Sequence, residues 1–205
     1  MKIAVFGGTF DPVHAGHTGL AGAVVQDGFA DRVLFMPAFR PPHKPDALIT
    51  PYEMRREMLS LALKNNPLFP VSDVEFERGG ESFTIDTLDT LAENRPDDKI
   101  MLLIGSDNLC QLHTWYQAHR LLREYSILVY PREDSTPARS ELLLHWSEEE
   151  TEKLFASFLP EPTRFPCSSS SIRAELAQGK TDAAEAFLEP EVLAYIKQHH
   201  LYKII

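Results

Sequence analysis

The chain has 205 residues, of which 43% are hydrophobic and 24% charged, with 20 Lys and Arg against 30 Asp and Glu. This composition is typical of a globular protein, and it excludes intrinsically disordered, collagen-like and coiled-coil chains. The net charge of −10 and the scattered basic residues argue against a protein that binds nucleic acid. One small phosphorylated ligand remains compatible with this charge, because a pocket can be locally positive.

The sequence indicates neither a membrane-spanning helix nor a secretory signal peptide. Every apolar run is shorter than the about 18 residues that a membrane-spanning helix requires. Glycines interrupt the apolar N-terminal run after residue 6, so we expect a strand there and no signal peptide. The two cysteines, Cys110 and Cys167, lack metal-type spacing and indicate a reduced, cytoplasmic protein.

Four short and nearly continuous apolar runs predict strands that are buried on both faces, at residues 3–6, 33–36, 101–104 and 127–129. Strand-like residues also occur at 71–76, before the Gly79-Gly80 turn. The Pro-rich stretch 37–51 and residues 131–140 are interpreted as loops within one domain that spans residues 1–205.

Segments with helical spacing alternate with these strands. Residues 51–65 predict a helix with Thr50 as N-cap, Pro51 at the first helical position and Glu53 completing a capping box. A second capping box predicts a helix from Ser147 to about residue 158, and further helices are expected at about 171–178 and 190–199. The alternation predicts an α/β fold with a mainly parallel open sheet and helices on both faces.

The first predicted strand runs into the sequence GGTFDPVHAGH, residues 7–17. Gly7 and Gly8 allow the backbone to approach a ligand closely. His14 and His17 lie three residues apart where a helix begins, so both side chains point into the same space. Because a helix N-terminus attracts anions, the segment predicts a phosphate site with imidazole donors. It matches neither a Walker A loop nor a GxGxxG fingerprint.

This segment resembles the signature of the HxGH nucleotidyltransferases, which are adenylyl- and cytidylyltransferases with a Rossmann-like fold. Further segments occur in the order found in the bacterial nicotinate-mononucleotide adenylyltransferase family, namely PPHK at 41–44, SFT at 82–84, IGSD at 104–107, TWY at 114–116 and SSSSIR at 168–173. The resemblance covers the whole chain.

The resemblance implies adenylyl transfer from ATP to nicotinate mononucleotide, which gives nicotinate adenine dinucleotide and pyrophosphate. The attacking phosphate is already ionised, so the protein has to position two anions and stabilise charge. Mg²⁺ is inferred from the use of ATP, and it would be held by phosphates and water, so no metal ligand is expected from the protein.

The resemblance also assigns roles to individual residues. The implied catalytic residues are His14, His17 and Arg173. The implied nucleotide-binding residues are Gly7, Gly8, Thr9, Phe10, Gly105, Asp107, Ser168, Ser169 and Ser170. The implied substrate-binding residues are Lys44, Thr84, Trp115 and Arg132, of which Arg132 has an undecided role.

Several roles have structural alternatives. One of the two histidines could only cap the helix, or both could bind a metal with Asp11. Asp107 could be a helix N-cap, the serine run a loop with an N-cap, Lys44 a solvated loop residue, and Trp115 a core residue. Arg55 faces either the phosphates or solvent, and the role of His43 is undecided. Cys110 and Trp146 are expected to be buried packing residues.

The sequence departs from the family pattern at a few positions. Cys167 replaces the usual isoleucine, Ser170 a threonine and Phe83 a tyrosine, and the segment containing Arg132 replaces an R-P-G motif. The rival functions are another HxGH transferase, such as pantetheine-phosphate adenylyltransferase, and a catalytically idle nucleotide-binding regulator. Oligomeric state is left undecided.

Overall fold

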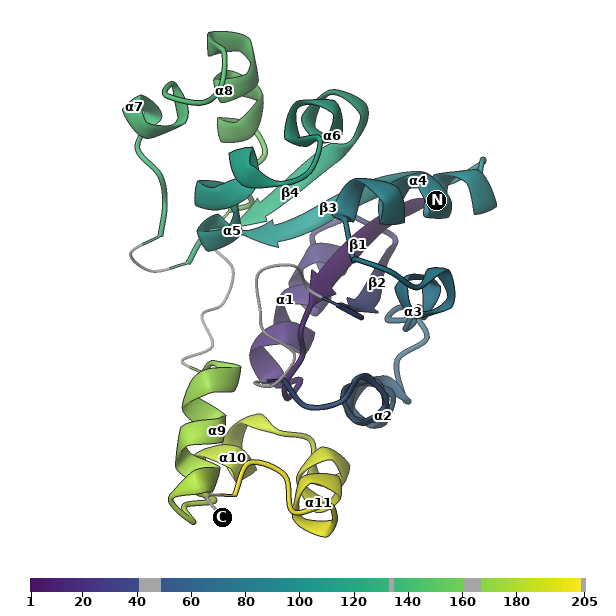
Figure 1. Ribbon diagram of the computed structural model, residues 1–205, viewed down its shortest axis with the longest axis vertical. Helices are drawn as coiled ribbons and strands as arrows, with labels where there is room; N and C mark the ends of the chain where they lie inside the picture. The colour runs from purple at the N-terminus through teal and green to yellow at the C-terminus, as the bar shows by residue number, and fades with distance from the viewer. Residues whose placement is uncertain (41–48, 133–134, 161–166, 204–205) are drawn as a thin grey trace.

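The computed structural model describes residues 1–40, 49–132, 135–160 and 167–203. Within these ranges, one all-parallel sheet has the strand order β2-β1-β3-β4 (Figure 1). Its strands are β1 (Lys2–Gly8), β2 (Arg32–Pro37), β3 (Lys99–Gly105) and β4 (Ser126–Tyr130). The four predicted strands and the parallel sheet are therefore confirmed.

Helices cover both faces of this sheet, as predicted. One face packs against helices α1 (Ala15–Gln26), α2 (Tyr52–Leu63), α9 (Ser169–Ala177) and α11 (Pro190–Gln198). The other face packs against α4 (Thr84–Asn94), α5 (Ser106–Gln111), α6 (Ala118–Glu124), α7 (Arg139–Leu142) and α8 (Glu148–Phe155). The remaining elements are α3 (Val74–Arg78), the 3₁₀ turn η2 (Leu112–Thr114) and α10 (Asp182–Phe187).

The two faces follow from alternation along each strand. In β1, Ala4 and Phe6 belong to the first core, whereas Ile3 and Val5 belong to the second. Since both sets are apolar, the strand appears in the sequence as a continuous hydrophobic run. Apolar burial on two faces is the main stabilising contribution that fixes this layered arrangement.

The strand order reverses between β1 and β3, and we call the space beyond the carboxyl ends of these two strands the crevice. The chain passes from β1 to β2 on one side, and then returns to β3 on the other side of β1. Ligands of open α/β sheets bind beyond the carboxyl ends of the strands where the order reverses in this way. The carboxyl ends concerned are Gly7–Gly8 of β1 and Gly105 of β3.

The predicted start of α2 is wrong in detail. Pro51 is the N-cap, and no side chain caps this end of the helix. Thr50 lies outside the helix because its backbone N–H donates to Asp11 Oδ2 at 3.2 Å and its carbonyl accepts from Arg55 Nε at 2.8 Å. A tertiary contact therefore prevails over the local capping signal.

The predicted strand at 71–76 is also wrong. Val71 forms an isolated bridge to Phe35, and the chain then turns into the short helix α3. The reason lies at Glu75, whose buried carboxylate accepts from the Thr87 hydroxyl at 2.9 Å and from the Phe39 N–H at 3.3 Å. The helix ends at Gly79, whose φ of +68° suits glycine, as the predicted turn requires.

The later helices agree with prediction more closely. Ser147 and Glu150 form the expected capping box, although α8 ends at Phe155, three residues early. Helix α9 begins at Ser169, two residues before its predicted start, and α11 begins at Pro190 as predicted. The part of the predicted loop 37–51 at residues 41–48, which includes His43 and Lys44, lies outside the described residues.

Trp146 is buried in the second core, as predicted, whereas the prediction for Cys110 is wrong. Cys110 is exposed near the end of α5, and its Sγ lies 3.3 Å from the Ser135 carbonyl. The inward positions of this helix are occupied by Ser106 and Leu109, which leaves Cys110 on the outer side.

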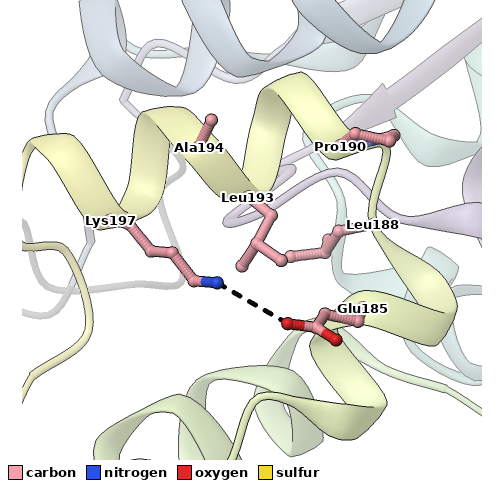
Figure 2. A pocket seen from close by; sticks show the side chains of 6 residues that line it. All are labelled: Glu185, Leu188, Pro190, Leu193, Ala194 and Lys197. Atoms are coloured by element: carbon pink, nitrogen blue, oxygen red, sulfur yellow. Dashed lines mark ion pairs between the residues drawn. The ribbon is translucent and has the colours of Figure 1, made fainter.

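A cavity of about 320 Å³ lies between α10 and α11. Figure 2 shows Leu188 and Leu193 facing it, with Lys197 extending toward Glu185 at 3.6 Å. It contains none of the predicted site residues. Across the described ranges, no helix combines the length and apolarity that crossing a membrane would require.

Candidate active site

The end of β1 leads into a tightly packed turn. Phe10 is 2% exposed and adopts a φ of +49°, which is unusual for a residue with a side chain. Its ring packs edge-on against Phe6 at 5.5 Å and His17 at 5.0 Å between centroids. A Cβ at Gly8 would lie 3.0 Å from the Phe10 ring, so a larger residue there would have to displace this buried ring. Phe10 can therefore offer a ligand only its backbone, whereas the space beside Gly7 is open.

The two histidines cap helix α1 reciprocally. His14 is the N-cap, and its Nδ1 accepts a hydrogen bond from the Gly16 N–H at 3.2 Å. The Nδ1 of His17 accepts from the His14 N–H, also at 3.2 Å. Since a backbone N–H can only donate, both Nδ1 atoms must be unprotonated, and each neutral ring carries its proton on Nε2.

This capping role does not compete with a ligand-binding role. The ring centroids of His14 and His17 lie 3.8 Å apart, so the two Nε2–H donors are brought together as predicted. Capping uses Nδ1, which leaves Nε2 of each ring for another acceptor. Both residues therefore cap the helix, and this capping is compatible with phosphate binding.

Burial keeps both imidazoles neutral. It lowers the pKa of His14 from its ordinary value of 6.5 to about 4, and the positive charge of Arg132 adds to this effect. The pKa of His17 is also well below its ordinary value, because of burial first and then of His14 and Arg132. Neutral rings with a fixed Nε2–H are preorganised hydrogen-bond donors.

Glycine at position 16 allows the His14 ring to fold back over the helix end. A Cβ at Gly16 would lie 3.0 Å from the His14 ring. The Cys167 sulfur lies 3.5 Å from His14 Nδ1, on the same side as the Gly16 amide. Burial raises the pKa of the Cys167 thiol, which favours the protonated form beside the unprotonated Nδ1.

The serine run forms the first turn of α9 and lies against the turn before His14. Ser168 is the N-cap, as the structural alternative predicts. Ser169 Oγ donates to the Pro12 carbonyl at 2.9 Å. Arg173 donates to the Asp11 carbonyl at 2.6 Å and to Ser170 Oγ at 3.3 Å. The α9 N-terminus is thereby fixed next to the two histidines.

Asp11 connects three distant segments. Its side chain is 4% exposed, and it accepts from the Tyr202 hydroxyl at 2.6 Å and from the Thr50 N–H at 3.2 Å. These two donors each engage one carboxylate oxygen, so Asp11 has a structural role in holding the turn. Among the residues that the structure describes, no group of three His, Cys, Asp or Glu side chains is arranged to hold a metal ion.

Neither alternative for Arg55 is correct. Its side chain is only 2% exposed, and its three nitrogens donate to the carbonyls of Thr9, Ala38 and Thr50, each at 2.8 Å.

Tyr202 was not predicted from the sequence, because a tyrosine near the C-terminus belongs to no recognisable motif.

The ends of β3 and β4 form the opposite wall of the crevice. Arg132 pairs with Asp107 at 3.3 Å and donates to the Tyr130 hydroxyl at 2.8 Å. A Cβ at Gly105 would overlap Asp107 Oδ1, so a larger residue there would have to displace the Asp107 side chain. Gly105, not Asp107, is the N-cap of α5, which makes the N-cap alternative for Asp107 wrong. Arg132, whose role is undecided from the sequence, thus lies beside Asp107, a residue that the resemblance assigns to ATP.

Thr84 and Trp115 lie on neighbouring elements. Thr84 is the first residue of α4, and Trp115 follows η2 with its ring half-buried against the second core. The rings of Phe83 and Tyr116, which adjoin these residues in sequence, have centroids 4.8 Å apart. Trp115 is therefore partly a core residue and partly available to a ligand.

Comparison with known proteins agrees with this geometry. The sequence profile of the Cytidylyltransferase-like family matches residues 5–175. A probable nicotinate-nucleotide adenylyltransferase of Caldicellulosiruptor bescii is 35% identical over an alignment of 208 residues. The alignment covers 99% of this chain and 100% of that protein. The chain belongs to the nicotinate-nucleotide adenylyltransferase family. A second relative in this family, from Solibacter usitatus, is 37% identical over 98% of this chain and all of its own length.

The fold of the nicotinate-nucleotide adenylyltransferase family extends to more distant structures. Plasmodium falciparum nicotinic acid mononucleotide adenylyltransferase, solved in complex with NaAD, matches with a TM-score of 0.79. The match covers 98% of this chain and 97% of that one at 20% identity, which establishes the Rossmann-like fold. The predicted fold class and family are therefore confirmed.

Proposed function

We propose that this protein transfers the adenylyl group of ATP to nicotinate mononucleotide, giving nicotinate adenine dinucleotide and pyrophosphate in NAD biosynthesis. The observation that carries this proposal is the pair of neutral imidazoles at the crevice, each with its proton fixed on Nε2. Family membership over the full chain selects this reaction among those that such donors can serve.

The reaction needs positioning and charge stabilisation. The phosphate of the mononucleotide attacks the α-phosphorus of ATP in line, and the bond to the departing pyrophosphate breaks. In our proposal His14 and His17 donate their Nε2–H groups to the phosphates, with His17 at the α-phosphate. These donors are already aligned, so little reorganisation accompanies the development of charge.

The surrounding residues bind the two substrates. Arg173 and the serines at the start of α9 receive the departing pyrophosphate, since a helix N-terminus and a guanidinium both favour anions. Gly105 and Asp107 bind the adenosine of ATP, together with the backbone of residues 7–10. Thr84, Trp115 and Lys44 bind the mononucleotide, and Arg132 supplies positive charge between the two substrates.

Mg²⁺ fits this site as a companion of ATP. The donors that surround the crevice are imidazoles, hydroxyls and guanidinium groups, which suit phosphate oxygens better than a metal ion. The ion would therefore be held by phosphate oxygens and water, and it would neutralise charge on the departing pyrophosphate. The work of the protein's own residues is to hold the phosphates from the other side.

We also propose that residues 1–205 form one cytoplasmic domain. The first core joins Phe6 and Phe10 of the sheet side to Ile172 and Val192 of the C-terminal helices, which supports one folding unit. Both cysteines are free thiols, which is the usual state in a reducing compartment.

The proposal is tested by measuring pyrophosphate release with Mg²⁺ and ATP. Nicotinate mononucleotide, nicotinamide mononucleotide and phosphopantetheine are compared as acceptors under identical conditions. We expect the highest kcat/KM with nicotinate mononucleotide. Activity with phosphopantetheine alone would overturn the acceptor, and absence of turnover with all three would indicate an idle nucleotide-binding regulator.

A further inference from the structure

The side chain of Arg55 ties together three segments that border the crevice. Thr9 directly follows β1, Ala38 directly follows β2, and Thr50 precedes α2. One guanidinium donates to the main-chain carbonyls of all three, at 2.8 Å in each case. Arg55 therefore holds both ends of the segment 38–50 against the turn that leads to the histidines.

Backbone contacts connect Ala38 and Thr50, two of the residues that Arg55 holds, to the turn that follows β1. The Ala38 N–H donates to the Gly8 carbonyl at 2.9 Å, so the exits of β1 and β2 already touch there. Thr50 in turn donates to the Asp11 carboxylate at 3.2 Å. A displacement of Ala38 or Thr50 would thus be transmitted to residues 8–11.

The chemistry of this position requires arginine. A guanidinium presents five N–H groups in a rigid planar fork, which can reach acceptors in three directions. A lysine ammonium is a compact charge on a flexible stem and cannot span the same three carbonyls. Burial lowers the pKa of Arg55, while the nearby Asp11 charge opposes this change.

This buried cation is not explained by a salt bridge. Within residues 1–40, 49–132, 135–160 and 167–203, Arg55 has no carboxylate within ion-pair distance. A buried charge costs desolvation free energy, and an apolar residue of similar size often stabilises a fold as well or better. The three convergent carbonyls point instead to a requirement for fixed loop geometry.

We infer that Arg55 is a positioning residue, which holds Ala38 and Thr50 in fixed register with the turn 9–14 so that the two substrates meet correctly. The inference rests on the proposed function, because it concerns the alignment of ATP with its acceptor. Since all three guanidinium nitrogens donate to main-chain carbonyls, Arg55 acts through the Thr9 and Ala38 carbonyls. Misalignment of this kind lowers catalysis steeply, even when the altered residue lies away from the reacting atoms.

The test compares Arg55→Lys with Arg56→Lys. Arg56 is the neighbouring residue on α2, and it is partly exposed and paired with Asp73 at 3.0 Å. We expect Arg55→Lys to raise KM for both ATP and nicotinate mononucleotide and to lower kcat/KM about 10- to 100-fold. Arg56→Lys should keep wild-type constants. A purely structural role would instead lower the active fraction, and hence the apparent kcat, with both KM values unchanged.

Hydrogen exchange of the ligand-free protein supplies a second readout that does not depend on activity. We expect faster exchange in Arg55→Lys at residues 8–14, 36–40 and 49–55, with wild-type exchange in β3. Unchanged exchange in these segments, wild-type KM values, or acceleration spread evenly into β3 would overturn the inference. If the lysine variant does not fold, Arg55→Gln removes the buried charge and allows the same comparison.

These measurements also separate the inference from the proposed function. Wild-type protein that does not turn over nicotinate mononucleotide would refute the function, while hydrogen exchange would still decide whether Arg55 anchors the two segments. An active wild-type protein with an Arg55→Lys variant indistinguishable from Arg56→Lys would refute the inference alone.

Discussion

The hydroxyl of Tyr202 donates a 2.6 Å hydrogen bond to Asp11 Oδ1 across 191 positions of the chain. The carboxylate of Asp11 is otherwise bonded to the Thr50 N–H. Burial and the neighbouring Asp11 charge raise the pKa of Tyr202, so the hydroxyl remains protonated and able to donate. Residue 202 is thereby attached to the turn that precedes His14 and His17.

Loss of this hydrogen bond should destabilise the protein. In Tyr202→Phe a buried carboxylate oxygen loses its donor, so we expect the free energy of unfolding to fall by about 2 kcal/mol. Urea unfolding at pH 7 measures this change. Tyr195→Phe is the matched control, since Tyr195 lies on α11 and contacts His199 at the protein surface. Equal unfolding midpoints for the two variants would contradict the prediction.

The Nε2–H of His17 should be needed for turnover. Removal of one preorganised donor to developing charge lowers kcat by about 100- to 1000-fold, and we expect His17→Ala to fall in this range. The variant also loses half of the reciprocal cap, which should cost about 1 kcal/mol of stability and leave the fold intact. Steady-state kinetics together with circular dichroism distinguish the two effects.

The control for this variant is His199→Ala, because His199 is exposed at the end of α11. It should keep the wild-type kcat. A wild-type rate in His17→Ala would refute the proposed role of the imidazole.

Local signals in the sequence were sufficient for the sheet and for the histidine motif. The strands are continuous apolar runs, and His14 and His17 lie three positions apart at the start of α1, a spacing that brings their side chains together. Arg55 and Tyr202 were inaccessible to the same reasoning. Their partners Thr9 and Asp11 lie 46 and 191 positions away, and only the folded topology brings such residues together.

Two wrong predictions, a strand at 71–76 and an N-cap at Thr50, have a common physical origin. The 71–76 segment has strand-like residues, but the buried Glu75 carboxylate needs donors that α4 and the Phe39 N–H provide, and this favours a helix. Thr50 has the residue type of an N-cap, but its backbone is engaged by Asp11 and Arg55. In both places a long-range polar contact prevails over a local preference.

The stability of the protein should decrease as the pH falls below about 6.5. Burial lowers the pKa of His14 to about 4 in the folded state, whereas the unfolded chain has the ordinary value of 6.5. The unfolded state therefore binds more protons between pH 6.5 and 4, so this contribution to stability is fully present above pH 6.5 and is lost through that window. We expect His14 alone to account for about 2 kcal/mol between pH 8 and pH 5.

Urea unfolding of the wild type and His14→Asn at pH 8 and pH 5 measures this dependence. Asparagine retains an N-cap side chain but does not titrate. The difference between the two pH values should be smaller in His14→Asn, and it should stay at the wild-type size in His200→Asn, which alters an exposed histidine. An undiminished difference in His14→Asn would exclude His14 as its source.

Removal of the positive charge at Arg132 should raise the pKa of both His14 and His17. Arg132 lowers the pKa of His14 and of His17 through its charge, in addition to the larger effect of burial. In Arg132→Gln the electrostatic contribution disappears while burial remains, so both pKa values should rise but stay below the ordinary 6.5. NMR titration of the imidazole resonances follows each ring separately.

Arg139→Gln, which removes an exposed arginine paired with Glu152, should leave both titrations unchanged. Identical titration curves in the wild type and Arg132→Gln would show that Arg132 does not act on the histidines through its charge.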